Sequence, residues 1–216
     1  MTAGEIVSIV VAVVIGYLLG SIPSAYIAVR LVKGKDIRQI GGGNVGGLNT
    51  YREVGAIPAL FVGIVDIGKG VAAVAIAYWL FQLPQLYVLL VGLAAVIGHN
   101  WMIFLKFSGG KGMGTTIGVL SFLMPVYGYW LGLVIFLGII LIPIIITHNV
   151  ALSLFIGLVC LPFITWLGMK SGPLTAWSIV IGVLIGLRFL PTARAALAKS
   201  KDKKDFVFDH WERDRR

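Results

Sequence analysis

The chain alternates between long apolar stretches and short polar segments that carry most of its charges. A membrane-crossing helix requires about 20 mostly apolar residues. Seven stretches come close to that length, so we predict an all-α, polytopic bundle of about seven transmembrane helices. The fourth is short and only turn signals divide the fourth to sixth, so six or eight spans are alternatives. The predicted spans are 6–29, 57–81, 86–106, 112–126, 128–147, 149–167 and 173–190.

Composition narrows the class of protein further. Of 216 residues, 58% are hydrophobic and 12% are charged, which is about half the usual charged fraction. So few charges do not cover the surface of a water-soluble domain, and so much apolar character excludes disorder. A single cysteine, Cys160, excludes an internal disulfide and a cysteine metal cluster. No histidine has partners at metal-ligand spacing, so we expect neither a metal nor a cofactor.

The basic residues predict the orientation of the bundle. With seven spans, one side of the membrane receives 16 of the 18 Lys and Arg residues. Cytoplasmic loops are the positive ones, so we place the N-terminus outside and the C-terminus in the cytoplasm. The chain is then one transmembrane domain, 1–191, followed by a charged cytoplasmic tail, 192–216. The location of the basic residues on the cytoplasmic side explains the positive net charge, so we expect no nucleic-acid partner.

A first glycine-rich segment follows the first predicted span, with five glycines among seven residues from 41 to 47. Glycine permits positive φ angles, and consecutive backbone N–H groups form a concavity that binds anions. The alternative is a flexible loop at the membrane surface, which usually contains Ser, Glu and Lys as well. We favour an anion site, with candidate residues Gly43, Asn44, Gly46, Gly47, Asn49 and Arg52.

A second glycine-rich segment surrounds a lysine and leads into a predicted helix. The N-terminus of a helix adds its dipole and free N–H groups to such a phosphate site. The spacing differs from a Walker A loop, in which the lysine precedes Ser or Thr. The alternative for Lys111 is an ordinary basic residue at the cytoplasmic end of a membrane span. For His99, a role in a fixed hydrogen bond is favoured over a role as a catalytic base. The candidates are His99, Gly109, Gly110, Lys111 and Gly112.

Two ionisable residues, Asp66 and Lys69, fall inside the second predicted span. Ionisable groups within the bilayer are costly and usually paired, and residues three apart share a helix face. We interpret them as a structural ion pair, with a functional pair as the alternative. The small residues of 20–26 favour close helix packing. Together, two cationic glycine-lined pockets facing the cytoplasm suit a phosphorylated substrate that meets a lipidic one.

Five blocks in order, 20–26, 43–55, 66–70, 98–104 and 109–112, resemble the bacterial acyl-phosphate:glycerol-3-phosphate acyltransferases. These are small seven-span enzymes of phospholipid synthesis. The resemblance implies a multi-pass protein of the bacterial cytoplasmic membrane. It also implies transfer of a fatty acyl group from acyl phosphate to the first-position hydroxyl of glycerol 3-phosphate, which gives lysophosphatidic acid and phosphate.

The resemblance also implies roles and partners. Lys111 and Arg52, with loop N–H groups, stabilise the charge of the leaving phosphate. The rest of the rate acceleration comes from holding both substrates together. A substrate phosphate accepts the proton, so no protein general base is expected. The partners are acyl phosphate, glycerol 3-phosphate and membrane lipids, and the resemblance allows a peripheral enzyme that produces acyl phosphate. We expect a monomer.

Departures from the family pattern leave other hypotheses open. Several affected positions are ones that the family uses to hold glycerol 3-phosphate, so a divergent paralogue with a different acceptor is the second hypothesis. A non-catalytic lipid-binding membrane protein is the third. A small-anion transporter is disfavoured because no Lys, Arg, Asp or Glu lies between 112 and 169. The departing residues that bear on the acceptor are Gly42, Leu48, Ala151, Arg188 and Pro191, and Met102 and Ser108 depart from the pattern as well.

Overall fold

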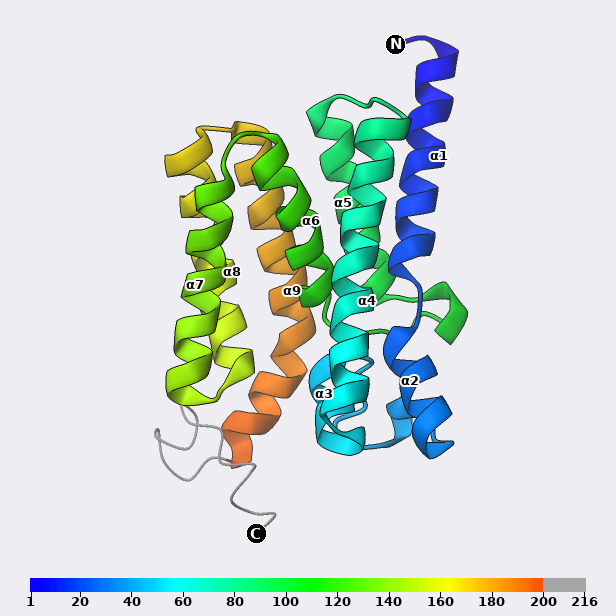
Figure 1. The fold of residues 1–216 in the computed structure, drawn as a ribbon, viewed down its shortest axis with the longest axis vertical. Helices are drawn as coiled ribbons and strands as arrows, with labels where there is room; N and C mark the ends of the chain where they lie inside the picture. The colour runs from blue at the N-terminus through cyan, green and yellow to red at the C-terminus, as the bar shows by residue number, and fades with distance from the viewer. Residues whose placement is uncertain (200–216) are drawn as a thin grey trace. The chain divides into compact units, whose positions relative to one another are not determined.

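The computed structural model describes residues 1–199, which form helices joined by short connections (Figure 1). The all-α prediction is confirmed over this range. The chain divides into two compact units, Met1–Leu123 and Met124 onward. The α-helices are α1 (Ala3–Gly20), α2 (Ser24–Lys33), α3 (Gly47–Val54), α4 (Ala56–Ala75), α5 (Gln85–Asn100), α6 (Met113–Val126), α7 (Trp130–Thr147), α8 (Val150–Ile164) and α9 (Gly172–Lys199). Short 3-10 turns are η1 (Ile37–Gln39) and η3 (Ile103–Leu105), and π-helical turns are η2 (Ile76–Leu80) and η4 (Thr165–Met169).

Helix α1 begins with a capping box. The Thr2 hydroxyl accepts a hydrogen bond from the Glu5 N–H at 3.3 Å, and the Glu5 carboxylate accepts one from the Thr2 N–H at 2.7 Å. These bonds satisfy backbone donors that a helix start leaves open. The helix is interrupted before Pro23, which lacks the N–H needed to continue the ladder. Helix α2 then runs to Lys33 and stops at Gly34, whose left-handed φ of 67° is typical of a C-terminal cap.

In the first unit, α4 packs against α1, α2, α3 and α5, and α1 packs along α5. Glycines let the helix backbones approach closely, as small residues do in membrane bundles. A Cβ atom on Gly98 would meet the Tyr17 backbone of α1, and one on Gly20 would meet the Ala95 backbone of α5. Gly20 therefore serves close packing, as predicted for its segment.

In the second unit, α7 packs on α8 and α8 on α9. Asn149 caps α8 by accepting a hydrogen bond from the Leu152 N–H at 3.0 Å. Gly157 of α8 lies against Ile140 of α7. Farther along, the Thr165 and Ser178 hydroxyls, 3.3 Å apart, form a hydrogen bond between η4 and α9. The unit is thus a hairpin of apolar helices extended by a third.

Every predicted span lies in a helical segment, with two differences. The first span is broken between α1 and α2, and the third ends at Asn100 instead of 106. After Asn100 the chain turns through η3, and Lys106 and Phe107 adopt positive φ angles of 55° and 59° that a helix cannot contain. Within residues 1–199, five helical segments are long and apolar enough to cross a membrane, and two apolar segments are shorter. The long ones are Ala3–Lys33, Ala56–Leu80, Trp130–Thr147, Val150–Met169 and Gly172–Arg194, and the shorter ones are Gln85–Asn100 and Met113–Val126.

Apolar side chains also cover the outside of these helices, which is expected for a protein surrounded by lipid. Examples are Leu60 and Ile64 on α4, Val134 and Ile145 on α7, and Val183 on α9. The structure therefore supports a membrane helical bundle. Most of the predicted charged tail, 192–216, lies outside the described residues.

Candidate functional site

The first glycine-rich segment forms the loop between η1 and α3, and Asn49 holds it closed. The Asn49 amide N–H₂ donates to the carbonyl oxygens of Ile40 at 3.2 Å and Asn44 at 3.0 Å. Its Oδ1 accepts from the Gly42 N–H at 3.1 Å. Gly41 has a φ of 56°, which permits the turn beside this amide. Asn49 is buried and builds the loop, and direct contact of Asn49 with a substrate stays a prediction.

The second glycine-rich segment, 109–112, leads straight into α6. The Gly110 N–H donates to the His99 carbonyl oxygen at 3.0 Å, which fixes the segment on the end of α5. Gly112 has a φ of 82°, and its carbonyl oxygen accepts from the Thr116 hydroxyl at 2.9 Å. This turn places Lys111 two residues before the first residue of α6, as the sequence predicted. A helix N-terminus beside a lysine is suited to binding phosphate.

The two segments meet at Gly110. A Cβ atom there would lie 2.6 Å from the Val45 carbonyl oxygen and would collide with the His99 ring. Val45 is buried in the middle of the first segment. The fold thus brings together two segments that are more than 60 residues apart in the printed sequence. Only glycine allows this approach, so the second segment's glycines have a packing role besides any ligand contact.

A buried polar cluster lies beneath these segments. Asp66 Oδ1 accepts from the Ser24 hydroxyl at 2.7 Å and lies 2.8 Å from Lys69 Nζ. The same oxygen is 3.6 Å from His99 Nδ1. Lys69 Nζ also donates to the Ile22 carbonyl oxygen at 3.1 Å, a group exposed by the break between α1 and α2. One carboxylate oxygen therefore joins α2, α4 and α5 directly below the glycine segments.

Three residues of this region were not among the predicted site residues. Ser24 was assigned to close packing, yet it donates to Asp66. Asn100 and Thr115 are fully buried, and within the described residues their side-chain polar atoms make no hydrogen bond. Asn100 Oδ1 faces Gly112. In the sequence, only their positions indicate that Asn100 and Thr115 belong to the site. Asn100 follows His99, and Thr115 lies in the first turn of α6.

The two predicted catalytic residues lie in the first unit, whereas the departures from the family pattern lie in both units. Arg52 lies in the last turn of α3, and Lys111 lies in the second glycine segment, both partly exposed. A side chain at Gly42, one of the departures from the family pattern, would meet no atom within 4 Å. The position is therefore open. The other departures that bear on the acceptor are Leu48 in α3, Ala151 in α8, and Arg188 and Pro191 in α9.

Next to the first glycine segment, Arg38 is tied to Asp36. Arg38 Nη2 lies 2.6 Å from Asp36 Oδ2, and Nε lies 3.0 Å from Oδ1. These hydrogen bonds hold the pKa of the Asp36 carboxyl below its usual value and raise the pKa of Arg38. Arg38 also lies over the Tyr26 ring and donates to the Leu105 carbonyl oxygen at 3.2 Å. The loop entry is thereby fixed to α2 and to η3.

Comparison with known proteins identifies the family of this chain. Residues 10–199 match the protein family described as Glycerol-3-phosphate acyltransferase. Glycerol-3-phosphate acyltransferase 1 of Dehalococcoides mccartyi is 46% identical over 202 residues, covering 94% of this chain and 97% of the relative. Glycerol-3-phosphate acyltransferase 2 of Moorella thermoacetica is 38% identical over 192 residues, covering 89% and 95%.

Solved structures of an integral membrane glycerol 3-phosphate acyltransferase, PlsY, share the fold. Its glycerol 3-phosphate form superposes with a TM-score of 0.77 at 30% identity, covering 88% of this chain and 92% of that one. Its lysophosphatidic acid form gives 0.72 at 28% identity, with the same coverage. The match therefore extends over both sequence and fold, and the chain belongs to the glycerol-3-phosphate acyltransferase family of integral membrane proteins.

Proposed function

We propose that this protein transfers a fatty acyl group from acyl phosphate to glycerol 3-phosphate, and so forms lysophosphatidic acid and phosphate. The observation that carries the proposal is the contact of Gly110 with Val45, which joins the segment before Lys111 to the segment before Arg52. Family membership supplies the acceptor, since the relatives are glycerol-3-phosphate acyltransferases. The identification of acyl phosphate as the acyl donor is the more specific part of the proposal.

The chemistry needs charge stabilisation more than proton transfer. The acceptor hydroxyl oxygen attacks the acyl carbon, and the bond from that carbon to the phosphate oxygen breaks. The phosphate leaves with the electron pair, and the hydroxyl proton passes to a substrate phosphate. Lys111, Arg52 and the N–H groups of the glycine segments are the donors available to the phosphate charge. Hydrogen bonds of Asn49 and of the Gly110 N–H fix the two glycine segments, so their N–H groups require little reorganisation.

The buried carboxylate does not suit the role of a base. Asp66 Oδ1 already accepts from Ser24 and pairs with Lys69, and the residue is only 4% exposed. A base must reach the substrate hydroxyl directly or through one water. This geometry supports a mechanism in which the substrate supplies its own proton acceptor.

The departures from the family pattern fit the same reaction. A relative that shares 46% identity over almost the whole chain is a glycerol-3-phosphate acyltransferase. We therefore infer that the substitutions at Gly42, Leu48, Ala151, Arg188 and Pro191 are tolerated by the acceptor site. A different acceptor and a non-catalytic protein are correspondingly disfavoured.

We also propose how the protein lies in the membrane. Five long and two shorter apolar helical segments support seven crossings, with the N-terminus outside and the C-terminus in the cytoplasm. The glycine segments then face the cytoplasm, where soluble glycerol 3-phosphate is available. Residues 1–191 form one transmembrane domain and 192–216 a cytoplasmic tail. The protein acts as a monomer in the bacterial cytoplasmic membrane and receives acyl phosphate from a peripheral enzyme.

The proposal is tested by comparing two acyl donors. Purified protein is given glycerol 3-phosphate with either palmitoyl phosphate or palmitoyl coenzyme A, and lysophosphatidic acid is quantified by mass spectrometry. We expect product from palmitoyl phosphate and at least 100-fold less from the thioester, because the phosphate leaving group is what the cationic loops bind. Equal rates from the two donors would contradict the role of acyl phosphate while leaving the acyltransferase activity intact.

A further inference from the structure

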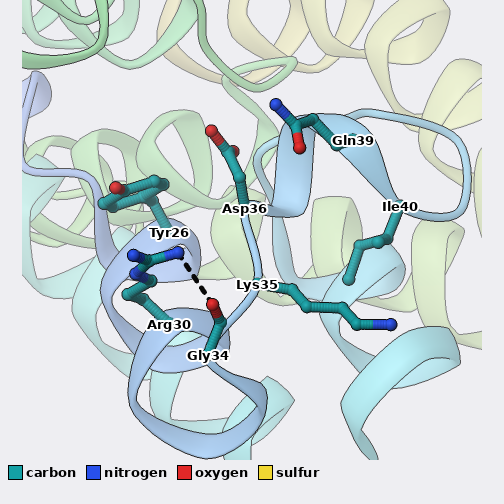
Figure 2. Close-up of a pocket in the computed structure, with 7 residues that line it drawn as sticks. All are labelled: Tyr26, Arg30, Gly34, Lys35, Asp36, Gln39 and Ile40. Atoms are coloured by element: carbon teal, nitrogen blue, oxygen red, sulfur yellow. Dashed lines mark hydrogen bonds between the residues drawn. The ribbon is translucent and has the colours of Figure 1, made fainter.

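A second polar site lies at the end of α2, outside the glycine segments. It is an open cavity of about 470 Å³. Figure 2 shows its side chains arranged around the turn after α2, with the Arg30 guanidinium bonded to the Gly34 carbonyl oxygen at 2.7 Å. None of the predicted substrate-binding residues contributes to it. Its lining residues are Tyr26, Arg30, Gly34, Lys35, Asp36, Gln39 and Ile40.

The charge of this cavity is positive. Asp36 is the one acidic lining residue, and Arg38 donates to both of its carboxylate oxygens, from Nε to Oδ1 and from Nη2 to Oδ2. Those bonds lower the pKa of Asp36, so its charge stays present and compensated by Arg38. Arg30 and Lys35 remain as cations at the cavity, and Lys35 has no hydrogen bond or ion pair within residues 1–199. Tyr26 and Gln39 add neutral polar groups.

The position along the span places the cavity at the level of lipid headgroups. Helix α1 has 18 residues and is therefore about 27 Å long, close to the hydrocarbon thickness of about 30 Å. Helix α2 continues beyond it and ends at the cavity. Ile27, Leu31 and Val32 of α2 are 42%, 81% and 59% exposed. Apolar side chains directed outward beside two cations match a phospholipid, whose acyl chains adjoin a charged headgroup.

We propose that this cavity binds the headgroup phosphate of an anionic glycerophospholipid, with Arg30 and Lys35 as the phosphate-binding residues. Tyr26 and Gln39 offer hydrogen bonds to the glycerol or headgroup hydroxyls. Gln39 and Ile40 lead directly into Gly41, so the bound lipid anchors the entry of the first glycine segment to the membrane surface. The inference concerns a binding site and does not depend on the acyl donor proposed above.

Binding of a short-chain lipid tests this proposal. Purified full-length protein in a neutral detergent is titrated by calorimetry with dihexanoyl phosphatidylglycerol, dihexanoyl phosphatidylcholine or inorganic phosphate. A cation near the membrane surface contributes about fivefold in affinity for anionic lipid. We therefore expect K35Q to weaken phosphatidylglycerol binding about fivefold and R30Q/K35Q about 25-fold, with K35R close to wild type.

A matched control is K33Q, which removes one charge from the same turn but does not line the cavity. It should change the affinity less than twofold, and K35Q should retain acyltransferase activity. Equal affinity for phosphatidylcholine would overturn the proposal, because the headgroup charge would then be irrelevant. Displacement of the lipid by equimolar inorganic phosphate would show a free-anion site instead. Equal losses in K33Q and K35Q, or no binding by wild type, would also contradict it.

Discussion

The buried cluster around Asp66 gives the sharpest prediction about stability. Asp66→Asn removes the negative charge but keeps the size of the side chain. Lys69 Nζ, whose side chain is 2% exposed, would keep the Ile22 carbonyl oxygen at 3.1 Å and a neutral amide oxygen as acceptors, but no negatively charged partner. The ammonium group would then be buried without a counter-charge, and the Ser24 hydroxyl would face a neutral amide at 2.7 Å.

The magnitude follows from the burial of the pair. Breaking a buried ion pair by removing one partner costs about 3–5 kcal/mol. The free energy of unfolding of a typical protein is only about 5–15 kcal/mol. We therefore expect Asp66→Asn to lower the midpoint of thermal unfolding markedly and to reduce the yield of monodisperse protein in detergent.

The matched control removes both charges. In D66N/K69M no ammonium remains uncompensated, and replacing a buried pair by neutral groups is often close to neutral. The double variant should therefore recover about 2 kcal/mol or more of the loss in D66N, measured by unfolding of both variants in the same detergent. Wild-type stability of D66N, or equal losses in single and double variants, would refute the reasoning that the charge of Lys69 requires Asp66.

Three further predictions address the loops. Arg52→Ala and Lys111→Ala should each lower kcat/KM about 100-fold or more, measured by phosphate release; activity within threefold of wild type would contradict their roles. Gly110→Ala should lower activity more than tenfold, since its Cβ would meet the histidine ring and a carbonyl oxygen of the first segment, whereas Gly42→Ala, with no atom within 4 Å, should leave activity within about twofold. Asp36→Asn should cost about 0.5–1 kcal/mol at pH 7. Because the pKa of Asp36 is lowered in the folded protein, its contribution is present above about pH 4 and is lost as the pH falls through that lowered value, so the stabilities of wild type and variant should converge once the pH lies below it.

The apolar pattern predicted the helical segments well, because lipid and helix packing both require long apolar stretches. It failed where the backbone changes direction without a change in polarity. Trp101, Ile103 and Phe104 are apolar, so the pattern continued the third span to 106, whereas the helix ends at Asn100. The positive φ of Lys106 and Phe107 is a property of the folded turn, and neither residue type indicates it.

The candidate site was likewise predicted only in part. Glycine content located both loops, because few residue types permit such turns. Their contact at Gly110 depends on how α5 and α6 pack, which no local pattern contains. Ser24 likewise resembled a small packing residue until the fold placed it beside Asp66, 42 positions away in sequence. Asn49 was predicted to bind substrate because of its chemistry, whereas its amide is also needed to close the loop.

The acyl transfer reaction itself provides the most direct test of the account. Purified protein in lipid nanodiscs is supplied with palmitoyl phosphate and glycerol 3-phosphate, and released phosphate and lysophosphatidic acid are measured in the same samples. The account predicts that the two products accumulate in equal amounts and that both depend on glycerol 3-phosphate. Phosphate release without lysophosphatidic acid, or neither product from folded protein, would contradict it.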